Sequence, residues 1–157
     1  MDIAKTLSAS IGGTSLMSLF SYLISDSKNK NFKEPEILGE LIKRIIPDLN
    51  EKQADLAGWA LHFGAGTMFT TIYDQIWEKT SIKPDIKSGA IMGAISGLIG
   101  IAVWRATIAM HPKPPIKDYH SYYKHLMLAH VLFGIAAAES YKHTKSVSVE
   151  ELKKQIE

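Results

Sequence analysis

The sequence of 157 residues contains no cysteine, which excludes disulfide bonds, thiolate metal sites and thiol nucleophiles. The formal net charge is only +2. No basic stripe with interleaved aromatic residues occurs, so nucleic acid is not expected as a partner. The chain also lacks the phosphate-binding loop, the hydrolase elbow and the zinc-protease motif. We therefore expect a protein that is not an enzyme.

Charged side chains are missing from four long tracts of the chain. After the first five residues, the charges gather at 26–55, 74–87, 105–124 and 139–157. A helix rises ~1.5 Å per residue, so about 20 residues cross the ~30 Å hydrocarbon core of a bilayer. Each tract taken alone is also compatible with a buried helix of a soluble bundle. Four such tracts in one short chain favour the membrane.

The pattern predicts an all-α, polytopic membrane protein formed by a single domain, residues 1–157. Four transmembrane helices form two hairpins, and the lipid bilayer is the expected partner. The spans are expected at about 6–25, 56–77, 88–109 and 122–141. An even number of spans places both termini on one side, which we expect to be the cytoplasm.

The first tract is rich in small polar residues. Such residues let helices approach closely and form hydrogen bonds to neighbouring helices. We therefore expect this span to pack inside a bundle rather than to face lipid alone. The residues are Ser8, Ser10, Thr14, Ser15, Ser18 and Ser21.

An amphipathic helix is expected at about 35–46, in the connection between the first two spans. Pro35 suits the first turn of a helix and Pro47 ends one. Six apolar residues fall on one face, and the pair Glu40 and Arg44 has the favourable i, i+4 spacing on the opposite face. This helix either lies on the membrane surface or caps the bundle.

Aromatic residues stand near the ends of the expected spans. The aromatic residues Trp59, Trp77, Trp104 and Tyr141 are expected to act as interfacial anchors. Asp74 and Glu139 also lie at span ends, where we expect them to be exposed at the interface.

Three glycines, Gly89, Gly93 and Gly97, recur at four-residue spacing in the third tract. This glycine-zipper pattern indicates a groove into which another helix packs closely. The occupant is either another span of the same chain or a second protein, which includes a second copy of this chain.

The spacing His-x3-Gly-x6-Tyr occurs twice, beginning at His62 and at His130. Two equivalent hairpins would form a parallel repeat with both histidines at one depth. A chance match of common residue types remains the alternative.

His62 and His130 are the candidate ligand or proton-binding residues, because an ionisable group inside a membrane is costly. A pair of imidazoles is able to bind haem or a metal, or to relay protons. We favour neutral histidines that form hydrogen bonds between helices, and we expect no cofactor.

The segments TSLMSLFSYLIS, FKEPEILGELI and GWALHFGAGTMFTTIYDQIW resemble small bacterial integral membrane proteins, the YagU-like and related families of unknown function. The resemblance covers about residues 7–77 and rests on Glu34-Pro35-Glu36, Gly58-Trp59, His62, Gly66, Tyr73 and Trp77. The second half departs from it, because no Gly-Trp pair precedes His130. The resemblance implies a multi-pass protein of the bacterial inner membrane and supplies no activity.

Two functions remain open at this stage. The favoured one is a structural or accessory subunit that docks a membrane-protein partner through the glycine groove and the amphipathic helix. The alternative is a small transport or binding unit, for a proton, ion, metal or haem, that uses His62 and His130. Few intramembrane polar groups are available to line a pathway, which favours the first.

Overall fold

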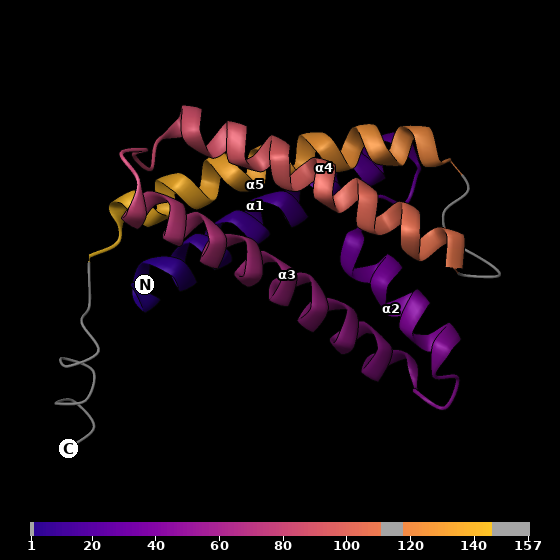
Figure 1. Ribbon diagram of the computed structural model, residues 1–157. Coiled ribbons are helices and arrows are strands. Elements are labelled where there is room, and N and C mark those ends of the chain that lie inside the picture. Colours follow the sequence, from indigo (N-terminus) through magenta and orange to yellow (C-terminus); the bar gives the residue numbers. More distant parts are fainter. Residues whose placement is uncertain (1, 111–117, 146–157) are drawn as a thin grey trace, which may run out of the picture.

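The computed structural model describes residues 2–110 and 118–145, and every regular element in these ranges is a helix (Figure 1). The all-α fold class is therefore confirmed. The helices are α1 (Ile3–Lys28), α2 (Glu34–Ile45), α3 (Glu51–Lys79), α4 (Ile86–Met110) and α5 (Tyr119–His143). The four expected spans lie within α1, α3, α4 and α5, and α2 begins and ends one residue before the expected amphipathic helix.

Local capping explains where the helices begin. Asn50 and Gln53 form a reciprocal capping box at the start of α3, with both hydrogen bonds 3.0 Å long. Asp118 accepts a hydrogen bond from the Ser121 amide at the start of α5. At the end of α1, Asn29 adopts a left-handed conformation (φ 50°) that stops the helix.

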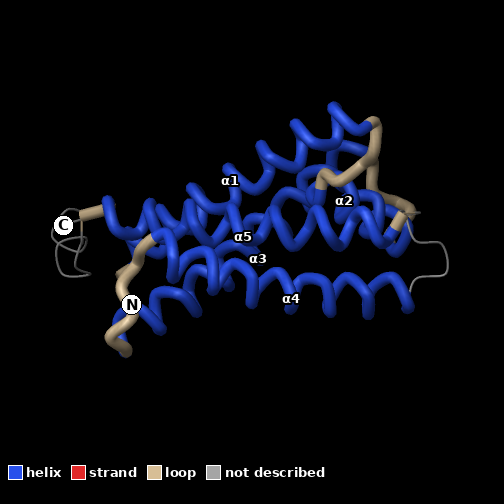
Figure 2. Tube along the Cα trace, turned by 90° about the horizontal axis from the view of Figure 1, so that it is seen from above, coloured by secondary structure: helices blue, strands red, loops and turns tan. Residues whose placement is uncertain are grey.

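The four long helices pack as an open row rather than a closed ring. α3 packs against α1, α1 against α5, and α5 against α4, whereas α2 packs against α3. α3 and α4 are not in extensive contact, and their ribbons diverge toward the end where α2 lies (Figure 1). The view in Figure 2 shows the long helices running side by side. The start of α1 and the end of α5 share one end, where Thr144 donates a hydrogen bond to Ser8 at 2.7 Å.

α1 and α4 bury mainly small or polar side chains and expose apolar ones. The buried face of α1 carries Thr6, Ser10, Thr14, Ser18, Ser21 and Ser25. The exposed face of the same helix carries Ile3, Leu7, Ile11, Leu16, Leu19 and Leu23. In α4 the buried residues include three glycines and Ser96, whereas Ile91, Ile95, Leu98, Ile99 and Val103 are exposed. On these two helices the distribution is the reverse of that on an amphipathic helix of a water-soluble bundle.

Two of the described helices, α1 and α4, are long and apolar enough to cross a membrane. The expectation that four helices meet this standard is wrong, because α3 and α5 do not. Polar side chains lower the mean hydropathy of these two helices. Among them are His62 and Asp74 in α3 and His125 and His130 in α5. These side chains are buried within the bundle.

The glycine stripe of α4 lies against α5 of the same chain. A Cβ atom at Gly89 would overlap the main chain at Gly134, and one at Gly93 would overlap the His130 carbonyl oxygen. At Gly97, a Cβ atom would lie 3.0 Å from the Met127 sulfur. The groove that the sequence predicted is thus occupied by a helix of this chain.

The expected aromatic anchors lie mostly inside the bundle. The residues Trp77, Trp104 and Tyr141 are 6%, 9% and 3% exposed, and Trp59 is half-buried. Trp77 packs against Tyr141, with ring centroids 4.8 Å apart. The expectation of anchors at the interface is therefore corrected for these three, because their rings fill space between helices.

Asp74 is fully buried, which corrects the expectation that it is exposed at the interface. Its carboxylate accepts a hydrogen bond from the Tyr141 hydroxyl at 2.8 Å and one from the Asp2 amide at 3.2 Å. These donors come from α5 and from the residue that precedes α1. Asp74 therefore joins three parts of the chain at one end of the bundle.

The two copies of the His-x3-Gly-x6-Tyr pattern pack differently. Gly66 of α3 lies against Thr14 of α1, whereas Gly134 of α5 lies against Gly89 and Gly93 of α4. If a two-fold axis related the hairpins, α1 would correspond to α4 and α3 to α5. The contact between α1 and α5 would then have a counterpart between α4 and α3. Extensive contact exists only between α1 and α5 and not between α3 and α4, so the two hairpins pack differently.

Candidate functional site, a cavity between the hairpins

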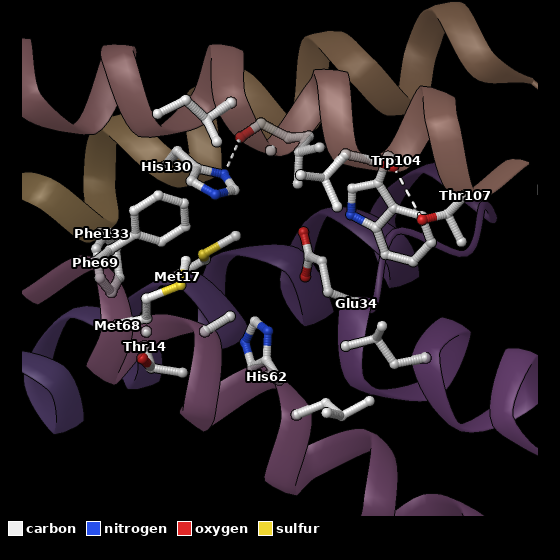
Figure 3. A pocket seen from close by; sticks show the side chains of 18 residues that line it. Thr14, Met17, Glu34, His62, Met68, Phe69, Trp104, Thr107, His130 and Phe133 are labelled. Atoms are coloured by element: carbon white, nitrogen blue, oxygen red, sulfur yellow. Dashed lines mark hydrogen bonds between the residues drawn. The ribbon is translucent and has the colours of Figure 1, made fainter.

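A cavity of about 310 Å³ lies between α3, α4 and α5, with α1 at its base and α2 at one end (Figure 3). Most lining side chains are apolar, among them Phe69, Phe133 and Leu126. The polar lining groups are Thr14, Glu34, His62, Thr107 and His130. The cavity therefore joins a largely apolar wall to a few polar groups, the usual composition of a small-molecule site.

The mouth of the cavity opens where α3 and α4 diverge. Besides Ala65, four larger lining residues are well exposed: Leu61 and Met68 on α3, and Ile99 and Val103 on α4. All four are apolar and belong to the outer apolar surface of the bundle. A molecule that enters between them would come from the medium that contacts this surface.

His62 and His130, the two histidines singled out from the sequence, both line this cavity. Nε2 of His62 lies 2.9 Å from the Ser18 hydroxyl oxygen of α1, which is a hydrogen bond between helices. Nδ1 of His130 lies 2.9 Å from the Leu126 carbonyl oxygen. A carbonyl oxygen only accepts, so Nδ1 carries the proton and Nε2 of a neutral ring has a free lone pair.

Glycine makes room for the His130 ring. The ring lies against Gly100 of α4, where a Cβ atom would be 3.0 Å from Nε2. Phe69 of α3 packs edge-on against the same ring, with centroids 5.9 Å apart. The imidazole is therefore fixed by its own helix, by α4 and by α3.

Glu34, the first residue of α2, is 2% exposed and lines the cavity. Its Oε1 accepts a hydrogen bond from the Ser21 hydroxyl at 3.1 Å. Its Oε2 has no partner among the described residues, and the carboxyl group points toward the middle of the cavity in Figure 3. Burial raises the pKa of Glu34 from 4.5 to about 8, so at neutral pH the group is mainly the uncharged acid.

Behind Glu34, a buried hydrogen-bonded chain leads to His125. Nε2 of His125 lies 2.9 Å from the Ser21 hydroxyl oxygen. The imidazole is stacked between the rings of Phe20 and Phe32, with centroids 5.0 and 4.6 Å away. The Ser25 hydroxyl accepts a hydrogen bond from the Phe32 amide at 2.9 Å. This network connects α1, α5 and the start of α2.

Four buried side-chain polar atoms of the described residues lack a hydrogen-bond partner, and two of them belong to this cavity. They are Oε2 of Glu34 and Oγ1 of Thr14. Gly66 lies directly against Thr14 Oγ1, so a larger residue there would displace the hydroxyl. Buried polar groups are normally paired, so these two atoms are the unpaired hydrogen-bonding groups of the cavity wall.

Sequence reasoning found the two histidines but missed Glu34, Ser21 and His125. A usable signal was present in α1, whose buried hydroxyl residues recur at intervals of three and four. That spacing marks one helix face, so its neighbours in space are expected to be polar as well. Nothing in the sequence places Glu34 next to His125, 91 positions away.

In the part of the chain that the structure describes, no group of three or more His, Asp or Glu residues is placed to hold a metal ion. His62 and His130 each have a hydrogen-bond partner, as described above. The resemblance to YagU-like membrane proteins stays a prediction. No protein-family model, curated protein or solved structure matches the chain.

Proposed function

We propose that this chain is a multi-pass membrane protein that binds one apolar chain from the bilayer in the cavity between α3 and α4. The observation that carries the proposal is the cavity itself. Its mouth lies on the exposed apolar surface, and its interior holds the two unpaired polar atoms of Thr14 and Glu34.

The reversed distribution of side chains supports four spans rather than two. In a bilayer, exposed leucine and isoleucine contact lipid at no cost, whereas polar groups need partners inside the bundle. α3 exposes Leu56, Leu61, Met68 and Ile72 and buries His62 and Asp74. The polar residues that lower the apolar character of α3 therefore do not face lipid in this arrangement.

The glycine stripe and the amphipathic helix, which suggested an accessory subunit, both make their contacts within this chain. The glycine stripe of α4 is covered by α5. α2 packs against α3 through Pro35 and Gly39, and its apolar residues Ile37 and Leu41 are buried. The cavity, in contrast, opens outward. This geometry favours the binding alternative over the docking one, in the inner membrane that the resemblance implies.

Size and charge define the class of ligand. A volume of about 310 Å³ is at the lower end of the usual ligand-pocket range of about 300–1,000 Å³. It suits one acyl or prenyl chain rather than a whole two-chain lipid. The described lining contains no lysine or arginine, so it offers no cation to an anionic headgroup.

The absence of cysteine from the sequence allows a direct test of the four spans. Asn31→Cys and Ser81→Cys introduce single thiols at exposed positions, before α2 and after α3. If α3 crosses the membrane, an impermeant maleimide applied from one side labels only one of the two. Labelling of both from the same side would show that α3 does not cross, which would contradict the four spans.

Ligand binding is tested by closing the mouth of the cavity. Ala65 and Ala60 are both exposed alanines of α3, but only Ala65 lines the cavity. We expect lipid extracts of the protein, purified in mild detergent, to contain a single-chain apolar molecule that is strongly reduced in Ala65→Trp. Ala60→Trp should retain it. Equal amounts in both variants, or none in the wild type, would contradict the proposal.

A further inference from the structure

The hydrogen bonds behind Glu34 have a defined direction. Ser21 has one hydroxyl proton, which it donates to Glu34 Oε1. The same hydroxyl oxygen therefore accepts from Nε2–H of His125. Each donor in this chain points toward the cavity, and Glu34 Oε2 is its last member.

The uncharged acid places its proton on Oε2. Oε1 is already an acceptor from Ser21, and Oε2 is buried without a partner. An O–H group on Oε2 would donate into the cavity. His130 offers the complementary lone pair on Nε2, and the Thr14 hydroxyl both donates and accepts.

We propose that the polar end of the ligand is an uncharged hydroxyl group, so that the cavity binds a single-chain lipophilic alcohol whose oxygen accepts a hydrogen bond from Glu34. This inference rests on the proposed function, because it names the ligand class of that cavity. A hydroxyl both accepts and donates, so it also suits the lone pair of His130 or the hydroxyl of Thr14. A carboxylate would find no cation in the lining, and its charge would stay uncompensated.

The charge on Glu34 makes this binding depend on pH. The titratable groups near its carboxyl group are His125 and Tyr122 from α5 and Tyr22 from α1. Two further histidines line the same cavity, His62 on α3 and His130 on α5. α4 brings no titratable side chain to the described lining. On α2, Glu36 pairs with Lys33 at 3.5 Å. Histidine and tyrosine ordinarily titrate near 6.5 and 10, so Glu34 is the group that loses a proton between pH 7 and 9.

The experiment compares three radiolabelled probes with the same chain: 1-dodecanol, dodecanoate and dodecylammonium. Each is titrated at pH 7 into the full-length protein in nanodiscs, with empty nanodiscs as the background. We expect saturable binding of 1-dodecanol and binding of dodecanoate that is at least about tenfold weaker. Dodecanoate or dodecylammonium that binds as tightly as 1-dodecanol would overturn the inference.

Two variants of Glu34 test the hydrogen bond itself. Glu34→Gln keeps an N–H donor at this position, so it should bind 1-dodecanol equally at pH 7 and pH 9. The wild type should bind it about tenfold more weakly at pH 9, when the O–H donor is lost. Glu34→Leu should bind weakly at both values. A wild-type affinity that does not change with pH would contradict the role of Glu34.

The outcomes separate this inference from the function beneath it. If all three probes bind equally and Ala65→Trp blocks them, the cavity binds apolar chains but does not select an alcohol. If no probe binds, the binding function and the inference both fail.

Discussion

Gly93 of α4 lies directly against the main-chain oxygen of His130 in α5, so the two helices touch through their backbones at the level of the cavity. A Cβ atom at Gly93 would overlap that oxygen. This contact fixes the position of α4 on one side of the cavity. It also fixes the position of His130 in the cavity wall. Packing of the glycine stripe and the shape of the cavity are therefore linked.

Gly93→Ala is expected to destabilise the protein by about 2 kcal/mol or more, because backbone atoms cannot move away as a side chain can. Gly64→Ala is the matched control, since no heavy atom lies within 4 Å of a Cβ there in the described structure. That variant should be neutral or slightly more stable. Apparent Tm values in detergent distinguish them, and equal values would remove the close-packing argument.

The stability of the wild type should fall as the pH rises from 5 to 9. Burial raises the pKa of Glu34 from 4.5 to about 8, so the folded state holds this proton more tightly than the unfolded state. The stabilisation is complete below about pH 4.5 and is lost as the pH rises through about 8. The loss is on the order of several kcal/mol.

Glu34→Gln should flatten this dependence, because the amide does not titrate. Glu36→Gln, on the same helix but partly exposed, should keep the wild-type slope. Apparent Tm measured at pH 5, 7 and 9 gives the result. An equal slope in wild type and Glu34→Gln would show that another group controls the pH dependence.

Tyr141→Phe is expected to cost about 1–3 kcal/mol, because it removes a donor from the fully buried Asp74. Tyr123→Phe serves as the control, since its hydroxyl makes no hydrogen bond to the described residues and its ring is partly exposed. It should change stability by less than about 0.5 kcal/mol. The same loss in both variants would mean that ring packing, rather than the hydrogen bond, stabilises this end.

His62→Gln and His130→Gln are both expected to fold with small losses of stability. The loss is about 0.6–2 kcal/mol for the hydrogen bond of His62 between helices and about 0.5–1.5 kcal/mol for the bond of His130 within α5. His62 would lose its contact with Ser18, and His130 its bond to Leu126. Absorbance spectra and metal analysis of the purified wild type check the cofactor expectation. A haem band or stoichiometric metal that disappears in either variant would contradict it.

The helices and their approximate bounds were predictable from sequence, because charge-free tracts and prolines mark them directly. The glycine stripe was also predictable from its four-residue spacing. The helix that packs on it was not, because the same spacing on α4 would suit either α5 or a helix of a separate protein. The aromatic residues were misjudged. Trp77 and Tyr141 stand at helix ends in the sequence, but the open row of helices places their rings in the interior.

The cavity was only partly predictable. His62 and His130 were recognisable as costly residues in apolar tracts. Glu34 was not, because it lies in a polar connection where a glutamate is ordinary. Its burial depends on the way α2 folds back onto the bundle, so that Ser21 and His125 meet its carboxyl group. Contacts between residues so distant in sequence depend on tertiary packing.

The open row of helices has a consequence for biosynthesis. α4 has extensive contact only with α5 among the long helices, so in the proposed membrane arrangement it would have to stay in the bilayer before its neighbour is synthesised. α1 is also made before its partners, and these two are the helices apolar enough to cross a membrane alone. In the chain, the more polar α3 comes after α1, and the more polar α5 comes after α4. If the proposed four spans hold, this order would let each apolar helix provide the surface against which the next, more polar helix inserts.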